Sequence, residues 1–296
     1  MSREVDRLPE PKEIRRKKVI VASPSRSGTL GLYAAMKILG YRPYHLYECV
    51  CVQGSTHIKI FREAIIAQYN WLSGVKRLRK PDCEKWLADY DCIIEVPSYL
   101  GMDVIQSYID DPEVKFILTE RNPKNWALSF NNTAAKVAAL ATTFPVSILK
   151  YFHADLYHFF DVNVLVYRAL SSNTKPGDAE NEEMLCEYYS EYIKKAKATI
   201  PDDRLLLIKL EDEDGIDWDT ICPFLGLPVP KEDYPDRHFP EKFAALLQEF
   251  LQPRVKAAMF RCVLLTVSLL GATGWAMVKY GPSLLPALPR FMFSPP

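Results

Sequence analysis

Short apolar runs alternate along the chain with longer segments in which apolar residues recur at helical spacing. Four runs predict buried strands, at residues 19–22, 91–96, 114–119 and 205–208. The helical patterns predict helices at residues 29–39, 57–72, 98–108, 134–170, 182–199 and 218–225, and one more that opens at 122–125 with Asn as its cap and Pro in its first turn. Because strands alternate with helices, we predict an α/β fold with a doubly wound, mostly parallel sheet flanked by helices.

Ligands of such sheets bind beyond the carboxyl ends of the strands, and three polar segments follow predicted strands there. The loop 23–29, with the sequence SPSRSGT, joins the first strand to the first helix. Its Gly, hydroxyls and single Arg suit a turn in which backbone N–H groups and the positive helix end hold an anion. It is not a nucleotide-binding Walker loop, because Gly28 is followed by Thr29 and Leu30 instead of by Lys and a hydroxyl residue.

The other two segments supply a carboxylate and a second cation. Glu95 ends the second strand, where a buried acidic side chain must be paired, solvated in a cleft or used in chemistry. Arg121 leaves the third strand, and Ser129 lies eight residues further on, in the next helix. This spacing predicts that both side chains share one face and could clamp one phosphate. Taken alone, an Arg after a strand is more often an ion-pair partner.

A different pattern occupies the C-terminal end of the chain. Residues 262–278 form a run of seventeen residues without a charge, and counting back to Ala257 extends it to about 22, with only Arg261 inside. No polar face appears at helical spacing, and the length suffices to cross a hydrocarbon layer. We therefore predict a C-terminal hydrophobic, membrane-anchor helix at 257–279 and a Pro-rich tail at 280–296. A buried core helix is the alternative.

Composition narrows the expected partners and compartment. Lys plus Arg and Asp plus Glu both number 37, and this zero net charge gives no support for a nucleic-acid partner. The seven cysteines are scattered without a CxxC pair, so we expect no metal site. The N-terminus is charged and lacks an apolar signal core, so the main domain is expected to face the cytosol. We predict a flexible arm at 1–17 and a main domain at 18–250, before the anchor helix and the tail.

These motifs together resemble the P-loop sulfotransferase superfamily, and most of all its sulfotransferase-like branch that is abundant in fungi. The loop 23–29 resembles the family's 5′-phosphosulfate loop, and TERNPKN at 119–125 with Ser129 resembles its 3′-phosphate segment. RLLLIKLED at 204–212 resembles a later strand, and CPFLGLP at 222–228 resembles the end of the helix that follows it.

The resemblance covers roughly residues 18–240 and implies that 3′-phosphoadenosine-5′-phosphosulfate donates a sulfuryl group to an acceptor hydroxyl. It implies that the 5′-phosphosulfate is held by Ser25, Arg26, Ser27, Gly28, Thr29 and Leu30. The 3′-phosphate would then be held by Arg121 and Ser129. Glu95 falls at the position of the family's catalytic base, two residues before a Pro, and Arg26 would stabilise charge on the bridging oxygen as it leaves.

Our main hypothesis is a membrane-tethered sulfotransferase that acts on a small hydrophobic, hydroxylated molecule in secondary metabolism. Aromatic side chains within 134–170 are expected to form part of the acceptor wall. One alternative is a donor-free isomerase, cyclase or dehydratase on the same fold, with Glu95 as acid or base. It stays open because the late Arg-Lys-Gly segment of cytosolic family members is not evident in this chain. The other alternative is a non-catalytic membrane adaptor.

Overall fold

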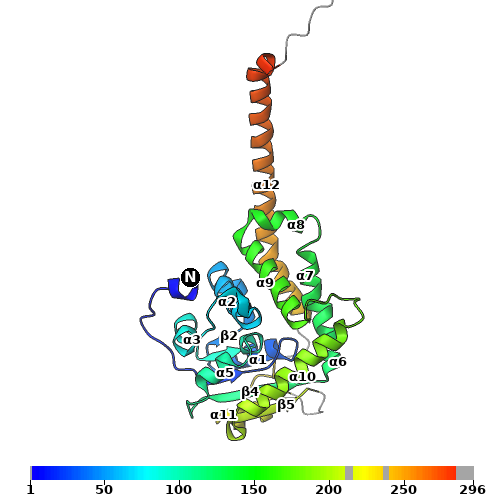
Figure 1. Cartoon of the computed structure of the whole chain (residues 1–296). Coiled ribbons are helices and arrows are strands. Elements are labelled where there is room, and N and C mark those ends of the chain that lie inside the picture. The colour runs from blue at the N-terminus through cyan, green and yellow to red at the C-terminus, as the bar shows by residue number, and fades with distance from the viewer. Residues whose placement is uncertain (1, 211–215, 236–239, 285–296) are drawn as a thin grey trace, which may run out of the picture.

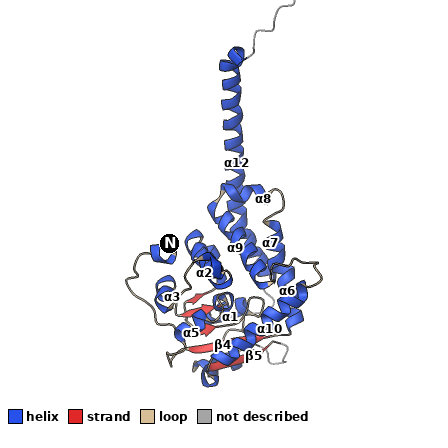
Figure 2. Ribbon diagram, in the orientation of Figure 1, coloured by secondary structure: helices blue, strands red, loops and turns tan. Residues whose placement is uncertain are grey.

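Five parallel strands form the sheet at the centre of the molecule, in the order β2-β3-β1-β4-β5 (Figures 1 and 2). The computed structural model describes residues 2–210, 216–235 and 240–284, the side chains of 240–244 and 281–284 excepted. Because β1 lies between β3 and β4, the chain winds in both directions from the middle of the sheet, and the predicted doubly wound fold is confirmed. The strands are β1 (Val19–Val21), β2 (Pro43–Tyr44), β3 (Cys92–Ile94), β4 (Lys115–Glu120) and β5 (Leu205–Lys209).

Helices cover both faces of the sheet and account for most of the chain (Figure 2). The α-helices are α1 (Thr29–Ile38), α2 (Ser55–Tyr69), α3 (Lys80–Trp86), α4 (Val96–Tyr99), α5 (Asp103–Tyr108), α6 (Pro123–Phe130), α7 (Lys136–Leu140), α8 (Val146–Leu149), α9 (Ala154–Leu170), α10 (Asn181–Thr199), α11 (Trp218–Leu225) and α12 (Pro240–Leu284). Shorter helical turns used below are η1 (Val5–Arg7), η2 (Glu48–Val52), η3 (Trp71–Ser73), η4 (Asn131–Ala135) and η5 (Lys150–Phe152).

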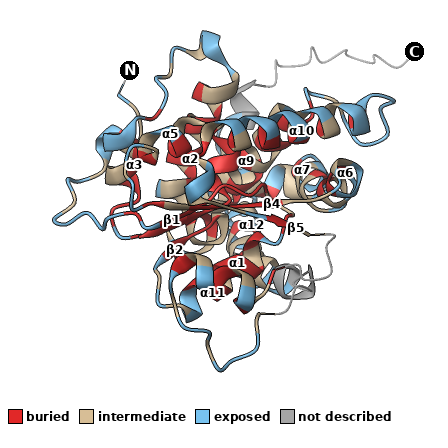
Figure 3. Ribbon diagram, turned by 90° about the horizontal axis from the view of Figure 1, so that it is seen from below, coloured by how far each residue is buried: buried red, intermediate tan, exposed pale blue. Residues whose placement is uncertain are grey.

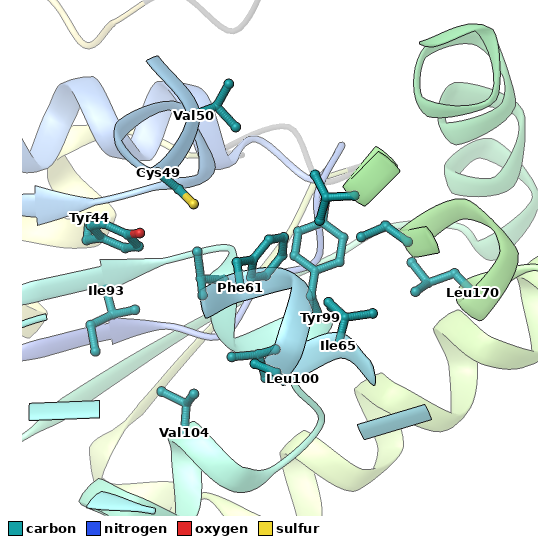
Figure 4. Packing of buried hydrophobic residues seen from close by; sticks show 14 of the residues in the cluster. Tyr44, Cys49, Val50, Phe61, Ile65, Ile93, Tyr99, Leu100, Val104 and Leu170 are labelled. Atoms are coloured by element: carbon teal, nitrogen blue, oxygen red, sulfur yellow. The ribbon is translucent and has the colours of Figure 1, made fainter. Parts of the chain in front are cut away.

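Two hydrophobic cores lie on opposite faces of the sheet. Along β1, Ile20 belongs to the larger core, whereas Val19 and Val21 belong to the smaller one, because successive side chains of a strand point to opposite faces. In Figure 3, α1 and α11 lie on one side of the strands, with α2, α5, α9 and α10 on the other. Figure 4 shows part of the larger core, in which Phe61 packs edge-on against Tyr99 with ring centroids 5.6 Å apart. Burial on both faces explains why the strands are continuously apolar.

The predicted elements agree with the structure in position but less well in extent. The missed strand, β2, has two residues, which is too short to leave a period in the sequence. The helix predicted at 98–108 divides into α4 and α5, and the break contains Gly101 with φ +65°. The segment 134–170 divides into the end of η4, α7, α8, η5 and α9.

Residues 2–17, expected to be a flexible arm, pack against the domain. Val5 in η1 is buried in the larger core, and the guanidinium of Arg3 forms an ion pair of 2.6 Å with Asp82. Arg16 forms a second ion pair, also of 2.6 Å, with Asp111. Leu8 also packs against the larger core, and Glu10 forms an ion pair of 2.7 Å with Lys85, so apolar contacts and ion pairs together hold the arm in place.

The last helix, α12, is continuous from the domain into free space (Figures 1 and 2). It runs without a break through the boundary predicted near residue 250, with Phe250 and Ala258 buried against the domain. Its stretch Ala245–Tyr280 is long and apolar enough to cross a membrane, and only 6% of the most apolar window is buried. Residues 285–296 of the predicted tail, and 211–212 of the later strand motif, lie outside the described residues.

Candidate active site

A cavity of about 500 Å³ opens at the carboxyl ends of β1, β3 and β4. Of the predicted site residues all line it except Ser27, which is fully buried beside it. Its polar wall comprises Ser25, Arg26, Gly28, Thr29, His45, Glu95, Tyr99, Arg121, Asn125 and Ser129. Its apolar wall, from η2, α2, α7, α9, α12 and the residues before η2, comprises Leu46, Val50, Phe61, Val137, Phe159, Val162, Val166, Leu246 and Leu247.

The loop after β1 is held by its carbonyl groups. Three successive carbonyl oxygens accept hydrogen bonds from β4 and the start of α6. The donors are Trp126 Nε1 to Ser25 at 2.7 Å, Arg121 Nη1 to Arg26 at 2.7 Å and Thr119 Oγ1 to Ser27 at 2.6 Å. Because C=O and N–H point in opposite directions across a trans peptide, the amides of residues 26–28 point away from these donors, and they donate to no described residue. This arrangement of free amides suits an anion.

Two residues of this loop have left-handed backbone conformations. Arg26 has φ +67° and Gly28 has φ +79°. At Gly28 the positive φ favours glycine, and a Cβ atom would lie 2.7 Å from Ile216 Cδ1, so that the end of that side chain would have to shift. At Arg26 the conformation costs on the order of 1–3 kcal/mol, the usual scale for strain kept at functional sites.

Two partly buried guanidinium groups face the same cavity. Arg26 Nε donates to Ser129 Oγ at 3.2 Å, and burial lowers the pKa of Arg26, against the nearby charge of Glu95, which raises it. Arg121 Nε is buried without a hydrogen-bond partner, as is the hydroxyl of Ser27. Among the described residues neither guanidinium is ion-paired with a carboxylate. Partly desolvated cations that form no ion pair favour a bound anion.

The pairing expected for Ser129 differs from the one observed. The spacing along the helix predicted that Ser129 would act together with Arg121, but its hydroxyl accepts from Arg26 instead. Arg121 is turned toward the loop, where its Nη1 bonds the Arg26 carbonyl. All three side chains still line one cavity, so the sequence predicted the members of the cluster but not the contacts between them.

Glu95 lies directly after β3 and is also left-handed, with φ +68°. Its side chain is 3% exposed, and it accepts a hydrogen bond of 3.1 Å from Tyr99 OH and a very short one from His45 Nε2. Burial alone would raise the pKa of Glu95, but the His45 ring, together with hydrogen bonds from Ser25 and Tyr99, outweighs it and leaves the pKa below its usual range. The carboxyl is therefore ionised at neutral pH.

His45 follows β2 and fixes this carboxylate. Its Nδ1 accepts the backbone N–H of Tyr47 at 3.0 Å, so the ring hydrogen is on Nε2, which points at Glu95. The carboxylate of Glu95 is thus paired with a histidine. This contact was not predicted, because β2 has only two residues and is too short to be recognised in the sequence.

A profile of the family described as "Sulfotransferase domain" matches residues 18–243. The chain belongs to this family. It is 29% identical over 219 residues to "Ava biosynthesis cluster protein M" of Aspergillus versicolor, which covers 74% of this chain and 79% of that one. It is also similar to the crystal structure of a sulfotransferase from Alicyclobacillus acidocaldarius, with 11% identity, a TM-score of 0.38, and 83% of this chain and 95% of that one covered. The resemblance drawn from the loop motifs is confirmed.

In this sulfotransferase-family chain the apolar wall of the cavity is mainly aliphatic. Phe159, Val162 and Val166 lie on one face of α9, at the spacing i, i+3 and i+7. The expectation that aromatic residues of 134–170 form the wall is met only by Phe159. Phe144 and Tyr151 point to the outside of the domain, because they lie on the connection between α7 and α9 and not on the inner face of either helix.

The described part of this sulfotransferase-family chain holds no cluster suited to a metal ion. No group of three or more His, Cys, Asp or Glu side chains comes together within it. The seven cysteines are all free thiols. Burial raises the pKa of the Cys49 thiol to about 12, so that this thiol stays protonated.

Proposed function

We propose that the protein is a membrane-anchored sulfotransferase that transfers a sulfuryl group from 3′-phosphoadenosine-5′-phosphosulfate to a hydroxyl of a small hydrophobic molecule. The observation that carries this proposal is the polar wall of the cavity. There, a loop with free amides and two guanidiniums that form no described ion pair adjoin an ionised Glu95. Family membership supports the transferase class.

The residues of the polar wall fit the donor. The amides of residues 26–28 and the start of α1 suit a 5′-phosphosulfate, since both offer N–H groups and α1 adds its positive end. Arg121 and Ser129 suit a 3′-phosphate, and the unpartnered Arg121 Nε supplies a donor for it. When bound, the donor supplies an activated sulfuryl group whose release leaves adenosine 3′,5′-bisphosphate.

Glu95 is the proposed proton acceptor. The carboxylate is ionised, and its contacts from His45 and Tyr99 hold it in one orientation. Both nitrogens of the His45 ring are committed, Nδ1 as the acceptor of the Tyr47 amide and Nε2 as a donor to Glu95, so that the carboxylate rather than the ring takes the acceptor's proton. General-base assistance of this kind contributes about 10²–10⁴-fold in rate. Arg26 donates to the oxygen on which negative charge develops.

The acceptor is proposed to be apolar and small. The aliphatic wall, from Leu46 to Leu247, offers contact area without hydrogen-bond partners, and the volume of about 500 Å³ suits a molecule of metabolite size. The relative in Aspergillus versicolor carries the name of a biosynthesis cluster protein, which supports a role in secondary metabolism.

The membrane part of the proposal rests on α12. The exposed apolar stretch of this helix has no cover among the described residues beyond Ala258. Arg254, Lys256 and Arg261 precede the apolar run, and positive charges favour the cytosolic side of a span. We therefore propose a C-terminal anchor with the main domain in the cytosol.

A donor-independent enzyme on the same fold is the second candidate. It is favoured by the hydrogen bonds of Glu95, which His45 and Tyr99 provide without any part of a donor. Such an enzyme would use Glu95 as an acid or base in an isomerisation, cyclisation or dehydration.

One incubation separates the two candidates. The purified protein is mixed with isotope-labelled donor and a panel of hydrophobic alcohols and phenols, and the products are analysed by mass spectrometry. The proposal predicts a labelled sulfate ester that is absent with the Glu95→Gln variant. Conversion of a panel member at the same rate without donor would favour the second candidate and contradict the first.

A further inference from the structure

Four exposed apolar side chains lie on elements beside the place where α12 leaves the domain. They belong to α7, α8, η5 and the loop between α7 and α8, and α12 packs against α8 and η5 (Figure 1). We call them the collar: Leu140, Phe144, Ile148 and Tyr151, which are 41%, 76%, 49% and 68% exposed. Four large apolar residues exposed within twelve positions form a patch, which differs from single apolar residues scattered over a surface.

The charges around the collar are of one sign. Residues 137–149 contain no charged residue, and the segment is bounded by Lys136 and Lys150. On α12 the nearest charges are Lys256 and Arg261, and no Asp or Glu occurs between residues 250 and 280 or between 131 and 154. The surface is therefore apolar at its centre and positive at its edge, which complements an anionic lipid surface.

Because α12 is held rigidly against the domain, it fixes the distance between the collar and the surface of any bilayer that α12 crosses. Arg261 Nη1 donates to the carbonyl of Phe152 in η5 at 3.1 Å, and Arg254 pairs with Asp155 at 3.0 Å, so no flexible linker separates domain and span. The uncharged run from Cys262 to Val278 is about 26 Å long at the helical rise, close to the hydrocarbon thickness. One bilayer surface then lies at the level of Arg261, which is the level of η5.

We propose that the collar is a second membrane contact, which seats the domain directly on an anionic bilayer surface around the base of α12. The collar inserts its apolar side chains at the depth of the lipid headgroups, while Lys136, Lys150 and Lys256 meet lipid phosphates. This inference rests on the membrane anchoring proposed above but is independent of the reaction. A second copy of the chain is the competing occupant, and it becomes an outcome of the test.

Photo-crosslinking from single positions of the full-length protein tests this contact. A benzophenone amino acid replaces Phe144 or Ile148, and the protein is reconstituted in vesicles of phosphatidylcholine and phosphatidylserine. The matched control replaces Trp71, which is 86% exposed in η3 at the far end of α2. The anchor control replaces Val267, which is 61% exposed within the span.

After illumination, adducts are identified by mass spectrometry. We expect lipid adducts at positions 144, 148 and 267, at least tenfold above the yield at position 71. Lipid adducts at 267 alone would show an anchor without a collar and overturn the proposal. Adducts from 144 or 148 to a second copy of the chain, or no lipid adduct at 267, would overturn it as well. None of these readouts depends on sulfuryl transfer, so failure here is distinct from failure of the proposed reaction.

Discussion

The two ends of the molecule depart from the usual distribution of polar and apolar groups in opposite directions. At the carboxyl ends of the strands, Glu95 is charged and buried, and Arg26 is charged and partly buried. Along the outer half of α12, residues such as Val267 and Leu270 are apolar and exposed. Buried charge costs free energy unless it is paired, and exposed apolar surface costs free energy unless it is covered.

The two ends differ in how far residues of the chain itself pair the buried polar groups or cover the exposed apolar side chains. Glu95 is compensated by His45 and Tyr99, whereas the amides of the loop and Arg121 Nε have no described hydrogen-bond partner. Along its described length, no part of the domain covers the exposed apolar side chains of the outer half of α12. The first end therefore indicates a small charged ligand, and the second indicates an extended apolar medium.

Removal of the carboxylate at the buried end should have the largest effect. Glu95→Gln keeps the volume and abolishes proton acceptance, so turnover should fall by about 10²–10⁴-fold. Binding of adenosine 3′,5′-bisphosphate should stay unchanged, because the base meets the acceptor and not the phosphates. The matched control is Glu120→Gln at the end of β4, whose carboxylate pairs with Lys197 outside the cavity. Near-normal turnover of Glu95→Gln would exclude Glu95 and make His45 the next candidate.

Loss of the second cation should be next in size. Arg121→Ala should weaken binding of adenosine 3′,5′-bisphosphate by about 2–4 kcal/mol, the scale for breaking a desolvated charge pair. Calorimetry measures the affinity, and Lys124→Ala on the exposed side of α6 controls for the change in charge. The apo protein should lose only about 1 kcal/mol, for the bond to the Arg26 carbonyl. If the apo variant unfolds instead, Arg121 is a structural residue.

Replacement of His45 should move the pH dependence of the reaction. The His45 ring lowers the pKa of Glu95, whereas burial raises it. In His45→Leu the effect of burial is no longer opposed by the ring, so the pKa of Glu95 should rise. The acid limb of the kcat/KM profile should therefore move to higher pH. At neutral pH the loss should be roughly tenfold, the weight of one charge-assisted hydrogen bond. His45→Gln keeps a donor toward Glu95 and should leave the limb closer to that of the unaltered protein. Equal acid limbs in the Leu and Gln variants would refute the positioning role of His45.

Removal of the apolar end should affect the domain least. Deletion of residues 257–296 keeps Phe250 and the Arg254–Asp155 pair but loses the buried Ala258 and the bond from Arg261 to Phe152. The free energy of unfolding should fall by about 2 kcal/mol, and the domain should become soluble.

Two observations check this deletion. A longer deletion, of residues 245–296, also removes Leu246 and Leu247 from the cavity wall and should destabilise the domain and impair acceptor binding. If the full-length protein is released from membranes by a carbonate wash and the shorter deletion aggregates, α12 is a docked helix and not an anchor.

The sequence predicted features that are formed by neighbouring residues or by residues that recur at a fixed spacing. The buried strands and the cap of α6, where Asn122 accepts from Lys124 N at 2.9 Å, were local patterns and were predicted well. Contacts between side chains that lie far apart in the sequence were not predicted. The contacts of Ser129 with Arg26 and of His45 with Glu95 join residues 103 and 50 positions apart, and nothing in the chain between them records the distance.

The sequence also did not predict that α12 is one continuous helix. The pattern of charges suggested a domain that ends near residue 250 and an anchor that begins near 257. In the structure one helix serves both, because its first turns bury Phe250 on the domain side while the apolar run simply continues the same axis. Hydropathy indicates where the environment along a helix changes, but it does not indicate whether the helix ends there.

Titration of the full-length protein with adenosine 3′,5′-bisphosphate tests the central claim most directly. Calorimetry with adenosine 5′-monophosphate as the control ligand isolates the contribution of the 3′-phosphate. The account predicts saturable one-to-one binding that the control ligand does not match and that Arg121→Ala weakens while Glu95→Gln does not. Absence of saturable binding, in a protein that still converts a hydrophobic substrate without donor, would contradict it.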